Sequence, residues 1–364
     1  MVNLFFLLSG ENPTLPAAEV RAILEAEGYS YTNLQVLDQV LRLESEVNCT
    51  KAVQIRSAYT RVSAQELLIA EANYEAITNA VAKTDFTSVL KKGESFVVRI
   101  NRIKNYADPE INTMTLEIKL GKQILSQTPG ATVSLKNPDK TFLGIITNDK
   151  LILGLKLSDI SSKTFSERRP RKKPFFHPSA MPSKMARCMV NLAHAKPEAV
   201  LLDPFCGTGT SLIEAAFIGC RAVGVDAQHR MILGTKKNLA YFGIEAEGLV
   251  LGDSRKIPLV RVDAVVTDPP YGRSSSTLRS TTMQLVKDVM ISLYALLGMG
   301  QRMCIALPIK LKQTGEIEHL SKEIEGYAKT VGFKKIEAHT VYVHRSLTRE
   351  IVIYEKTQPT TTRV

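Results

Sequence analysis

The stretch Ala199-Val-Leu-Leu-Asp203-Pro-Phe-Cys-Gly207-Thr-Gly209-Thr210 decides the fold of this chain. It opens with an apolar run that is typical of a strand buried on both faces of a parallel sheet. The glycines allow a tight turn, and a helical pattern from Thr210 to Ile218 follows, with Gly219 as its end. A strand that passes through a glycine turn into a helix predicts a doubly wound α/β domain.

The glycine turn predicts a positively charged cofactor rather than a dinucleotide. Leu212 stands where G-x-G-x-x-G requires its third glycine, and no Gly-Lys-Ser/Thr follows. The carboxylate of Asp203 would repel a pyrophosphate, whereas it suits the sulfonium and ammonium groups of S-adenosylmethionine. We expect Cys206 to be a small turn residue and not a nucleophile. The expected cofactor contacts are Asp203, Phe205, Cys206, Gly207, Thr208, Gly209 and Thr210.

Three further predicted strands end in aspartate, at Asp226, Asp253 and Asp268. Ligands of open α/β sheets bind at the carboxyl ends of the strands. Asp226 lies about 20 residues past the glycines, where a ribose diol is usually bound, and Asp253 with Ser254 is the candidate for the adenine amino group. A helix N-cap explains any one of these acids, but it does not explain all four together.

The tetrapeptide Asp268-Pro269-Pro270-Tyr271 predicts a clamp for an amino group of a base. Such an amino group is a poor nucleophile because its lone pair is delocalised into the ring. Asp268 offers an acceptor for its hydrogens, the two prolines end the strand, and Tyr271 offers a ring for stacking. The alternative is a strand end with no chemical role, and the motif needs its structural context to decide between them.

The remaining carboxyl-terminal pattern fits a mostly parallel sheet. We expect helices over Leu278–Leu297 and Glu316–Val331, the second ending at Gly332, and a strand over Arg302–Pro308. The runs Ile336–His344 and Arg349–Tyr354 are joined by a short link, which forces an antiparallel terminal hairpin.

The amino-terminal half predicts smaller α+β elements. Phe5–Leu8 is a short strand, and Leu15–Glu27 is a helix followed by Gly28. Phe96–Arg102 is a second strand, Ile111–Leu120 a helix that ends at Gly121, and Val133–Asp139 a strand that turns at Asn137-Pro138.

These motifs resemble those of the Rossmann-fold, S-adenosylmethionine-dependent methyltransferases that act on exocyclic amines. Over nearly the whole chain the sequence most resembles the tRNA guanine-N2-methyltransferases with a THUMP domain, in particular the archaeal group acting on guanosine 10. The resemblance implies tRNA as the partner and a segment from His177 to Lys184 that folds over the cofactor. It makes His177 and Ser183 cofactor candidates, although an ordinary linker is an equal interpretation for His177. The implied catalytic residues are Asp268, Pro269, Pro270 and Tyr271.

The resemblance also sets the expected domains. Residues 1–50 would belong to a ferredoxin-like part, 51–156 to a THUMP domain, 157–178 to a basic linker, 179–358 to the methyltransferase domain and 359–364 to a flexible tail. Open alternatives are a related enzyme acting on guanosine 6 of tRNA, on ribosomal RNA or on an adenine N6, and an RNA-binding protein without catalysis.

The net charge of +11 favours a polyanionic partner. Between Ser161 and Pro178, six basic side chains stand against the single acid Glu167. A solvated charged face is the plain alternative, but the position before the catalytic domain favours phosphate contact. The RNA-binding candidates are Arg168, Arg169, Arg171, Lys172 and Lys173, with Arg345 on the substrate side of the terminal hairpin.

The composition argues against several other classes. Five cysteines without a C-x-x-C pair predict neither disulfides nor a zinc site, so we expect no metal and a reducing cytoplasm. The opening apolar run is too short for a membrane span. We expect a monomer, with a partner subunit left open.

Overall fold

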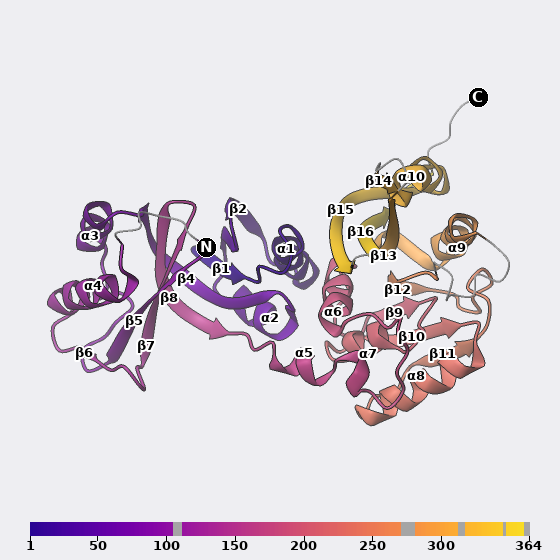
Figure 1. Cartoon of the computed structure of the whole chain (residues 1–364), viewed down its shortest axis with the longest axis horizontal. Coiled ribbons are helices and arrows are strands. Elements are labelled where there is room, and N and C mark those ends of the chain that lie inside the picture. Colours follow the sequence, from indigo (N-terminus) through magenta and orange to yellow (C-terminus); the bar gives the residue numbers. More distant parts are fainter. Residues whose placement is uncertain (105–110, 271–280, 312–316, 345–346, 360–364) are drawn as a thin grey trace. The chain divides into compact units, whose positions relative to one another are not determined.

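The chain forms two compact units (Figure 1). The computed structural model describes residues 1–104, 111–270, 281–311, 317–344 and 347–359. One unit comprises Met1–Leu24, Gly28–Ile55 and Tyr59–Ser161, and the other comprises Glu25–Glu27, Arg56–Ala58 and Ser162–Val364.

The amino-terminal elements follow a βαββαβ order, which is that of a ferredoxin-like fold. Strands β3, β1 and β4 are neighbours and pair antiparallel, and β2 pairs with β3 on the outer side. The last strand of this motif, β4, lies beyond residue 50, where the sequence analysis places the boundary between the first two domains. β4 also pairs with β8, so one sheet continues across that boundary. The elements are β1 (Val2–Leu8), α1 (Leu15–Glu27), β2 (Tyr31–Leu37), β3 (Val40–Ser45), α2 (Cys49–Arg56) and β4 (Thr60–Glu71).

The next residues extend the same sheet to eight strands, in the order β2-β3-β1-β4-β8-β7-β5-β6. The helix predicted to end at Gly121 continues to Gln127, because Leu116, Leu120 and Ile124 are all buried along one face. The strand expected from Val133 is only the two-residue β6. The elements are α3 (Tyr74–Lys83), β5 (Ser95–Arg102), α4 (Thr113–Gln127), β6 (Thr132–Val133), β7 (Lys140–Thr147) and β8 (Lys150–Asp159).

The second unit contains the predicted parallel sheet. Strands β11, β10, β9, β12 and β13 lie side by side and run parallel, so their carboxyl ends meet at one edge. Helices α7 and α8 connect successive strands. The elements are α5 (Lys163–Glu167), the 3-10 turn η1 (Pro170–Lys172), α6 (Ser183–Leu192), β9 (Val200–Asp203), α7 (Thr210–Ala216), β10 (Arg221–Asp226), α8 (His229–Tyr241), β11 (Gly248–Leu251) and β12 (Val262–Thr267).

The predicted antiparallel hairpin is present near the carboxyl end of the chain, but its last strand lies inside the sheet and not at its edge. β16 pairs antiparallel with both β13 and β15, and Ile351–Tyr354 are completely buried. The helix expected from Glu316 begins later, at Leu320, because β14 pairs with β13 just before it. The elements are α9 (Thr282–Leu296), β13 (Leu297–Leu311), β14 (Ile317–His319), α10 (Leu320–Val331), β15 (Phe333–His344) and β16 (Leu347–Lys356).

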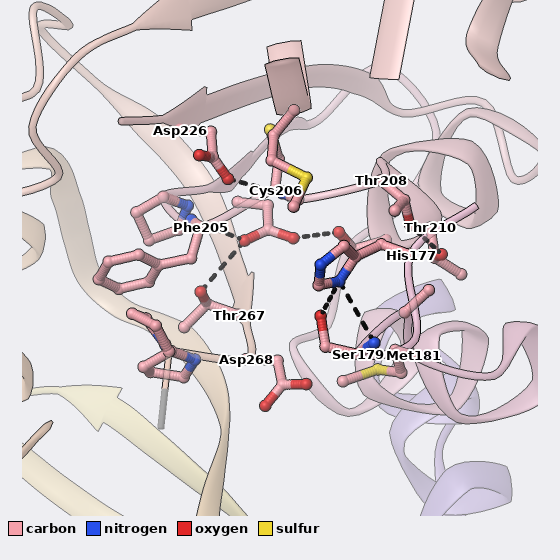
Figure 2. Close-up of a pocket in the computed structure, with 18 of the residues that line it drawn as sticks. His177, Ser179, Met181, Phe205, Cys206, Thr208, Thr210, Asp226, Thr267 and Asp268 are labelled. Carbon is pink, nitrogen blue, oxygen red and sulfur yellow. Dashed lines mark hydrogen bonds between the residues drawn. The ribbon is translucent and has the colours of Figure 1, made fainter. Parts of the chain in front are cut away.

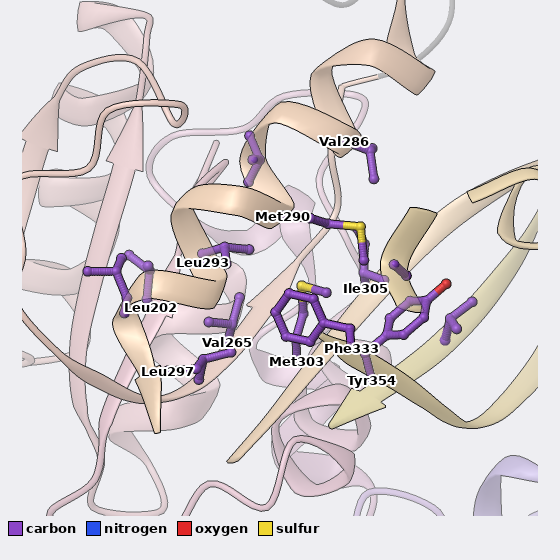
Figure 3. Close-up of a cluster of buried hydrophobic side chains, with 14 of the residues drawn as sticks. Leu202, Val265, Val286, Met290, Leu293, Leu297, Met303, Ile305, Phe333 and Tyr354 are labelled. Carbon is purple, nitrogen blue, oxygen red and sulfur yellow. The ribbon is translucent and has the colours of Figure 1, made fainter. Parts of the chain in front are cut away.

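A hydrophobic core between this sheet and the helices α9 and α10 holds the carboxyl-terminal strands in place (Figure 3). Leu285, Val289 and Leu293 repeat every fourth residue on α9 and are buried. Phe333 and Tyr354 join β15 and β16 to the same cluster. The core therefore fixes the strand that borders the site described next.

Candidate active site

The strand ends of the second unit surround one cleft of about 470 Å³ (Figure 2). This volume lies within the usual range of small-molecule sites, about 300–1,000 Å³. Asp203, Asp226 and Asp268 line it from three neighbouring parallel strands or their ends. The predicted cofactor residues Phe205, Cys206, Gly207, Thr208 and Thr210 and the predicted clamp residues Pro269 and Pro270 line the same cleft.

Asp203 organises the turn at the bottom of the cleft. Its Oδ1 accepts hydrogen bonds from the backbone N–H of Phe205 (3.0 Å) and the hydroxyl of Thr267 (3.1 Å), while Ser211 donates to Oδ2. The residue is only 4% exposed. Burial raises the pKa of Asp203 to about 7, although these hydrogen bonds favour its charged form. This structural role comes in addition to the cofactor contact expected from the sequence.

Asp226 supports the other side of the turn from the end of β10. Its Oδ2 accepts from the N–H of Gly207 at 3.0 Å, and its Oδ1 accepts from the N–H of Gln228 at 2.9 Å. Gly207 has a φ of 52°, in the left-handed region that favours glycine. Burial raises the pKa of Asp226. A carboxylate is thus fixed at the strand end where a ribose diol is usually bound.

One face of α8 holds the turn together, and the sequence analysis did not identify it. Thr235 donates to the carbonyl of Gly207 (2.7 Å), and Asn238 Nδ2 donates to the carbonyl of Thr208 (2.9 Å). Both residues are completely buried. They are one turn apart on the helix, and this polar pair on a buried face is the sequence signal that could have found them.

Asn238 and Gly234 also anchor the segment that leads to the cleft. Asn238 donates to the carbonyl of Phe175 (2.9 Å) and accepts from its N–H (2.8 Å). A Cβ on Gly234 would lie 2.0 Å from the ring of Phe175, so the ring packs directly on the helix backbone. This anchor lies just before His177–Pro182, which line the cleft.

The predicted cofactor residues of this segment have different positions. His177 lines the cleft, and its Nδ1 lies 2.7 Å from the hydroxyl of Ser179. Ser183 does not line the cleft; it is buried at the start of α6 and donates to the carbonyl of Arg168 at 2.6 Å. This hydrogen bond holds the start of α6, and the direct cofactor contact expected of Ser183 stays a prediction.

Two other predicted contacts also lie outside the cleft wall. Asp253 forms an ion pair with Arg255 (2.5 Å) and does not line the cleft, whereas its neighbour Ser254 does. The adenine contact expected of Asp253 stays a prediction. Gly209 is not a lining residue either; it has a φ of 75°, and a Cβ there would lie 2.7 Å from Thr235, so it permits close packing of the turn on α8.

The basic segment divides into two groups. Arg168 forms an ion pair with the fully buried Glu214 (2.8 Å). Lys173 is 5% exposed and donates to the hydroxyl of Thr210 at 2.6 Å. Burial lowers the pKa of Lys173 to about 8. We therefore no longer assign phosphate contact to Arg168 and Lys173, because their polar atoms are used inside the domain. Arg169, Arg171 and Lys172 are exposed and keep that assignment as a prediction.

The clamp residue Asp268 has a charged partner that the sequence analysis did not propose. Arg349, on β16, lines the cleft, and its Nη2 lies 3.1 Å from Oδ2 of Asp268. The signal in the sequence was an arginine directly before the acid and the apolar run Glu350–Tyr354 of an internal strand. Tyr271 and Arg345 lie outside the described residues.

Comparison with known proteins identifies both parts of the chain. Residues 170–319 match the RMKL-like methyltransferase domain, and residues 71–156 match the THUMP domain. The fold and the cleft therefore define a Rossmann-fold methyltransferase that carries a THUMP domain. The solved structure of TrmN from Thermus thermophilus is similar over 97% of this chain and 99% of its own, with a TM-score of 0.52 and 18% identity, which supports the fold alone.

Two archaeal relatives narrow this class. A tRNA (guanine(10)-N2)-dimethyltransferase from Methanothermobacter thermautotrophicus is 35% identical over 356 residues, which cover 98% of this chain and 100% of the relative. A protein of the same name from Pyrococcus abyssi is 37% identical over 265 residues, covering 72% and 74% of the two chains. The chain belongs to the family of tRNA (guanine(10)-N2)-dimethyltransferases.

Proposed function

We propose that this protein transfers a methyl group from S-adenosylmethionine to the exocyclic N2 of guanosine 10 in tRNA. The observation that carries the proposal is that Asp268-Pro269-Pro270 lines the same cleft as the glycine turn and Asp226. Both the cofactor motif and the amino-group clamp thus face one space, at the sheet edge where α/β folds bind ligands.

The residues around the cleft fit the cofactor. Asp226 would accept from the ribose hydroxyls, and the buried carboxyl of Asp203 would offset the positive charge of the sulfonium and ammonium groups. When bound, the cofactor supplies an electrophilic methyl group on sulfur. Thr208, Thr210 and His177 add polar groups to the wall, while Met181 and Leu285 add apolar surface.

Asp268 would act on the target base. The base has to leave its stack to enter the cleft, at a cost of a few kcal/mol. Asp268 would hold the amino group through its hydrogens and accept the proton that the nitrogen loses after it gains the methyl group. Stacking of the base on Tyr271 remains a prediction. Alignment of the amino nitrogen with the methyl group can supply about 7–11 kcal/mol in well-oriented systems.

The experiment that tests the function uses two tRNA transcripts. The full chain is incubated with labelled S-adenosylmethionine and either a tRNA with guanosine at position 10 or the same tRNA with adenosine there. Digestion and mass analysis then locate the modified nucleoside. We expect N2-methylguanosine and N2,N2-dimethylguanosine at position 10 of the first transcript only. Methylation of guanosine 6, of ribosomal RNA or of an adenine would instead support one of the alternative enzymes.

Replacement of Asp226 with alanine should weaken cofactor binding. Hydrogen bonds to a charged group contribute about 1.5–3 kcal/mol, so the dissociation constant should rise by roughly tenfold or more. Glu247→Ala is the control, since its exposed carboxylate pairs with Arg221 and does not line the cleft. Calorimetric titration with the cofactor measures both. An equal loss in the two variants would contradict the ribose role of Asp226.

Cofactor binding should depend on pH through Asp203. Its pKa of about 7 means that the carboxyl is largely protonated at pH 6, whereas a bound cation favours the charged form. Binding at pH 6 should therefore release a proton, and affinity should rise as the pH increases toward 7 and then level off. Calorimetry in buffers of different ionisation enthalpy measures this release. Asp203→Asn should abolish it; a wild-type protein that releases no proton would contradict the assignment.

The partner and the cellular location rest on the family. The THUMP domain and the exposed basic residues Arg169, Arg171 and Lys172 are consistent with binding of tRNA, because phosphate contacts position an RNA without reading its sequence. Among the described residues, none of the helices has the length and apolar character that a membrane crossing requires. All five cysteines are buried, and we keep the cytoplasm as the predicted location.

A further inference from the structure

A partly buried ion pair lies in the wall of the cleft, where it joins the end of β12 to β16, which is distant in the sequence. Arg349 is 7% exposed, and the side chain of Asp268 is 19% exposed. In the sheet Arg349 stands opposite Pro308 on β13 and Val341 on β15. The arginine therefore reaches Asp268 from the strand that is inserted antiparallel next to β13.

The ion pair between Asp268 and Arg349 can be explained by electrostatics. A buried charge is costly unless it is paired, and Asp203, which also lines the cleft, adds a second carboxyl that repels Asp268. The other titratable groups among the described residues of the cleft wall are Cys206, Asp226 and His177. Arg349 is the only Lys or Arg among the described lining residues. Its positive charge therefore offsets the negative charge of the carboxylates in the cleft wall.

We propose that Arg349 is a positioning residue of the methyl transfer, which keeps Asp268 charged and oriented toward the amino group of the target base. This inference rests on the proposed function. A guanidinium bound to Oδ2 fixes the plane of the carboxylate, and its charge opposes protonation of Asp268. Both effects favour a carboxylate that is ready to accept the amino hydrogens.

The test is a comparison of Arg349→Gln and Arg349→Lys with wild type on tRNA. In Arg349→Gln we expect kcat to fall by about a hundredfold, in the range of a lost acid–base contribution, with cofactor affinity nearly unchanged. The acidic limb of the profile of kcat against pH should move to higher pH, because loss of a nearby positive charge favours the protonated form of a carboxyl. The same comparison in the Asp203→Asn background identifies the titrating group, since a shift that persists there reports on Asp268 and not on Asp203.

Arg349→Lys separates charge from geometry. It keeps a positive charge, so its acidic limb should lie close to that of wild type, while kcat stays reduced because an ammonium lacks the planar fork of a guanidinium. The matched control is Arg221→Gln. Arg221 is exposed, pairs with Glu247 and stands at the amino end of β10, whereas the cleft lies at the carboxyl end, so activity should be unchanged.

The outcomes are distinguishable. If wild type methylates tRNA and Arg349→Gln shows the same acidic limb and a similar kcat, the positioning role is wrong while the proposed function stands. If wild type itself transfers no methyl group to any tRNA, the proposed function fails first. A fall in kcat with an unmoved acidic limb and an equal fall in Arg349→Lys would mean that Arg349 only supports the fold, which also overturns the inference.

Discussion

Replacement of Asp268 with alanine is expected to abolish methyl transfer. The carboxylate is the group that would hold the amino hydrogens and take up the proton, and loss of such a group lowers kcat by about a hundredfold to ten-thousandfold. Cofactor binding should remain nearly intact, because Asp226 and the glycine turn are unchanged. Initial rates with labelled S-adenosylmethionine and calorimetric titration measure the two quantities independently.

Two further variants sharpen this test. Asp268→Asn keeps an acceptor for the amino hydrogens but cannot take up the proton, so residual activity in it would separate holding the base from accepting the proton. Asp263→Asn is the control on the same strand, at the amino end of β12, where the residue accepts from the N–H of Val200 at 2.9 Å. A fully active Asp268→Ala protein would overturn the assignment of the clamp.

Replacement of Gly234 with alanine is expected to disrupt the cofactor site from a distance. The new Cβ would lie 2.0 Å from the ring of Phe175, so the ring and the segment after it must move. Overpacking of this kind costs about 1–3 kcal/mol in unfolding free energy. Since His177–Pro182 line the cleft, cofactor affinity should fall as well. Thermal unfolding and cofactor titration are the measurements.

The control for this prediction is Gly326→Ala in α10. Gly326 is also helical, but a Cβ there would meet no atom within 4 Å. Alanine is favoured over glycine in a helix by about 1 kcal/mol, so this variant should be slightly more stable than wild type and bind the cofactor equally well. Gly234→Ala with the same behaviour as Gly326→Ala would show that Phe175 does not hold the cleft wall.

Local sequence patterns were sufficient for part of the site. The apolar runs that end in Asp203, Asp226 and Asp268 are strands of a parallel sheet, and parallel strands bring their carboxyl ends to one edge. That the three acids lie at one edge of the sheet therefore follows from the strand pattern, whereas the order β10-β9-β12 within the sheet does not follow from chain order. Asp253 obeys the same pattern, but its side chain pairs with Arg255, two residues away, which the strand pattern could not indicate.

The sequence by itself determined the order of strands and helices, the cofactor turn and the clamp motif, because each depends on neighbouring residues and on the period of apolar side chains. Only the tertiary structure decided which charges face the cleft. It buried Lys173, paired Arg168 with the buried Glu214 and brought Arg349 to Asp268 through an inserted last strand. The physical reason is that burial and ion pairing depend on packing between distant segments, and a local pattern carries no information about those neighbours.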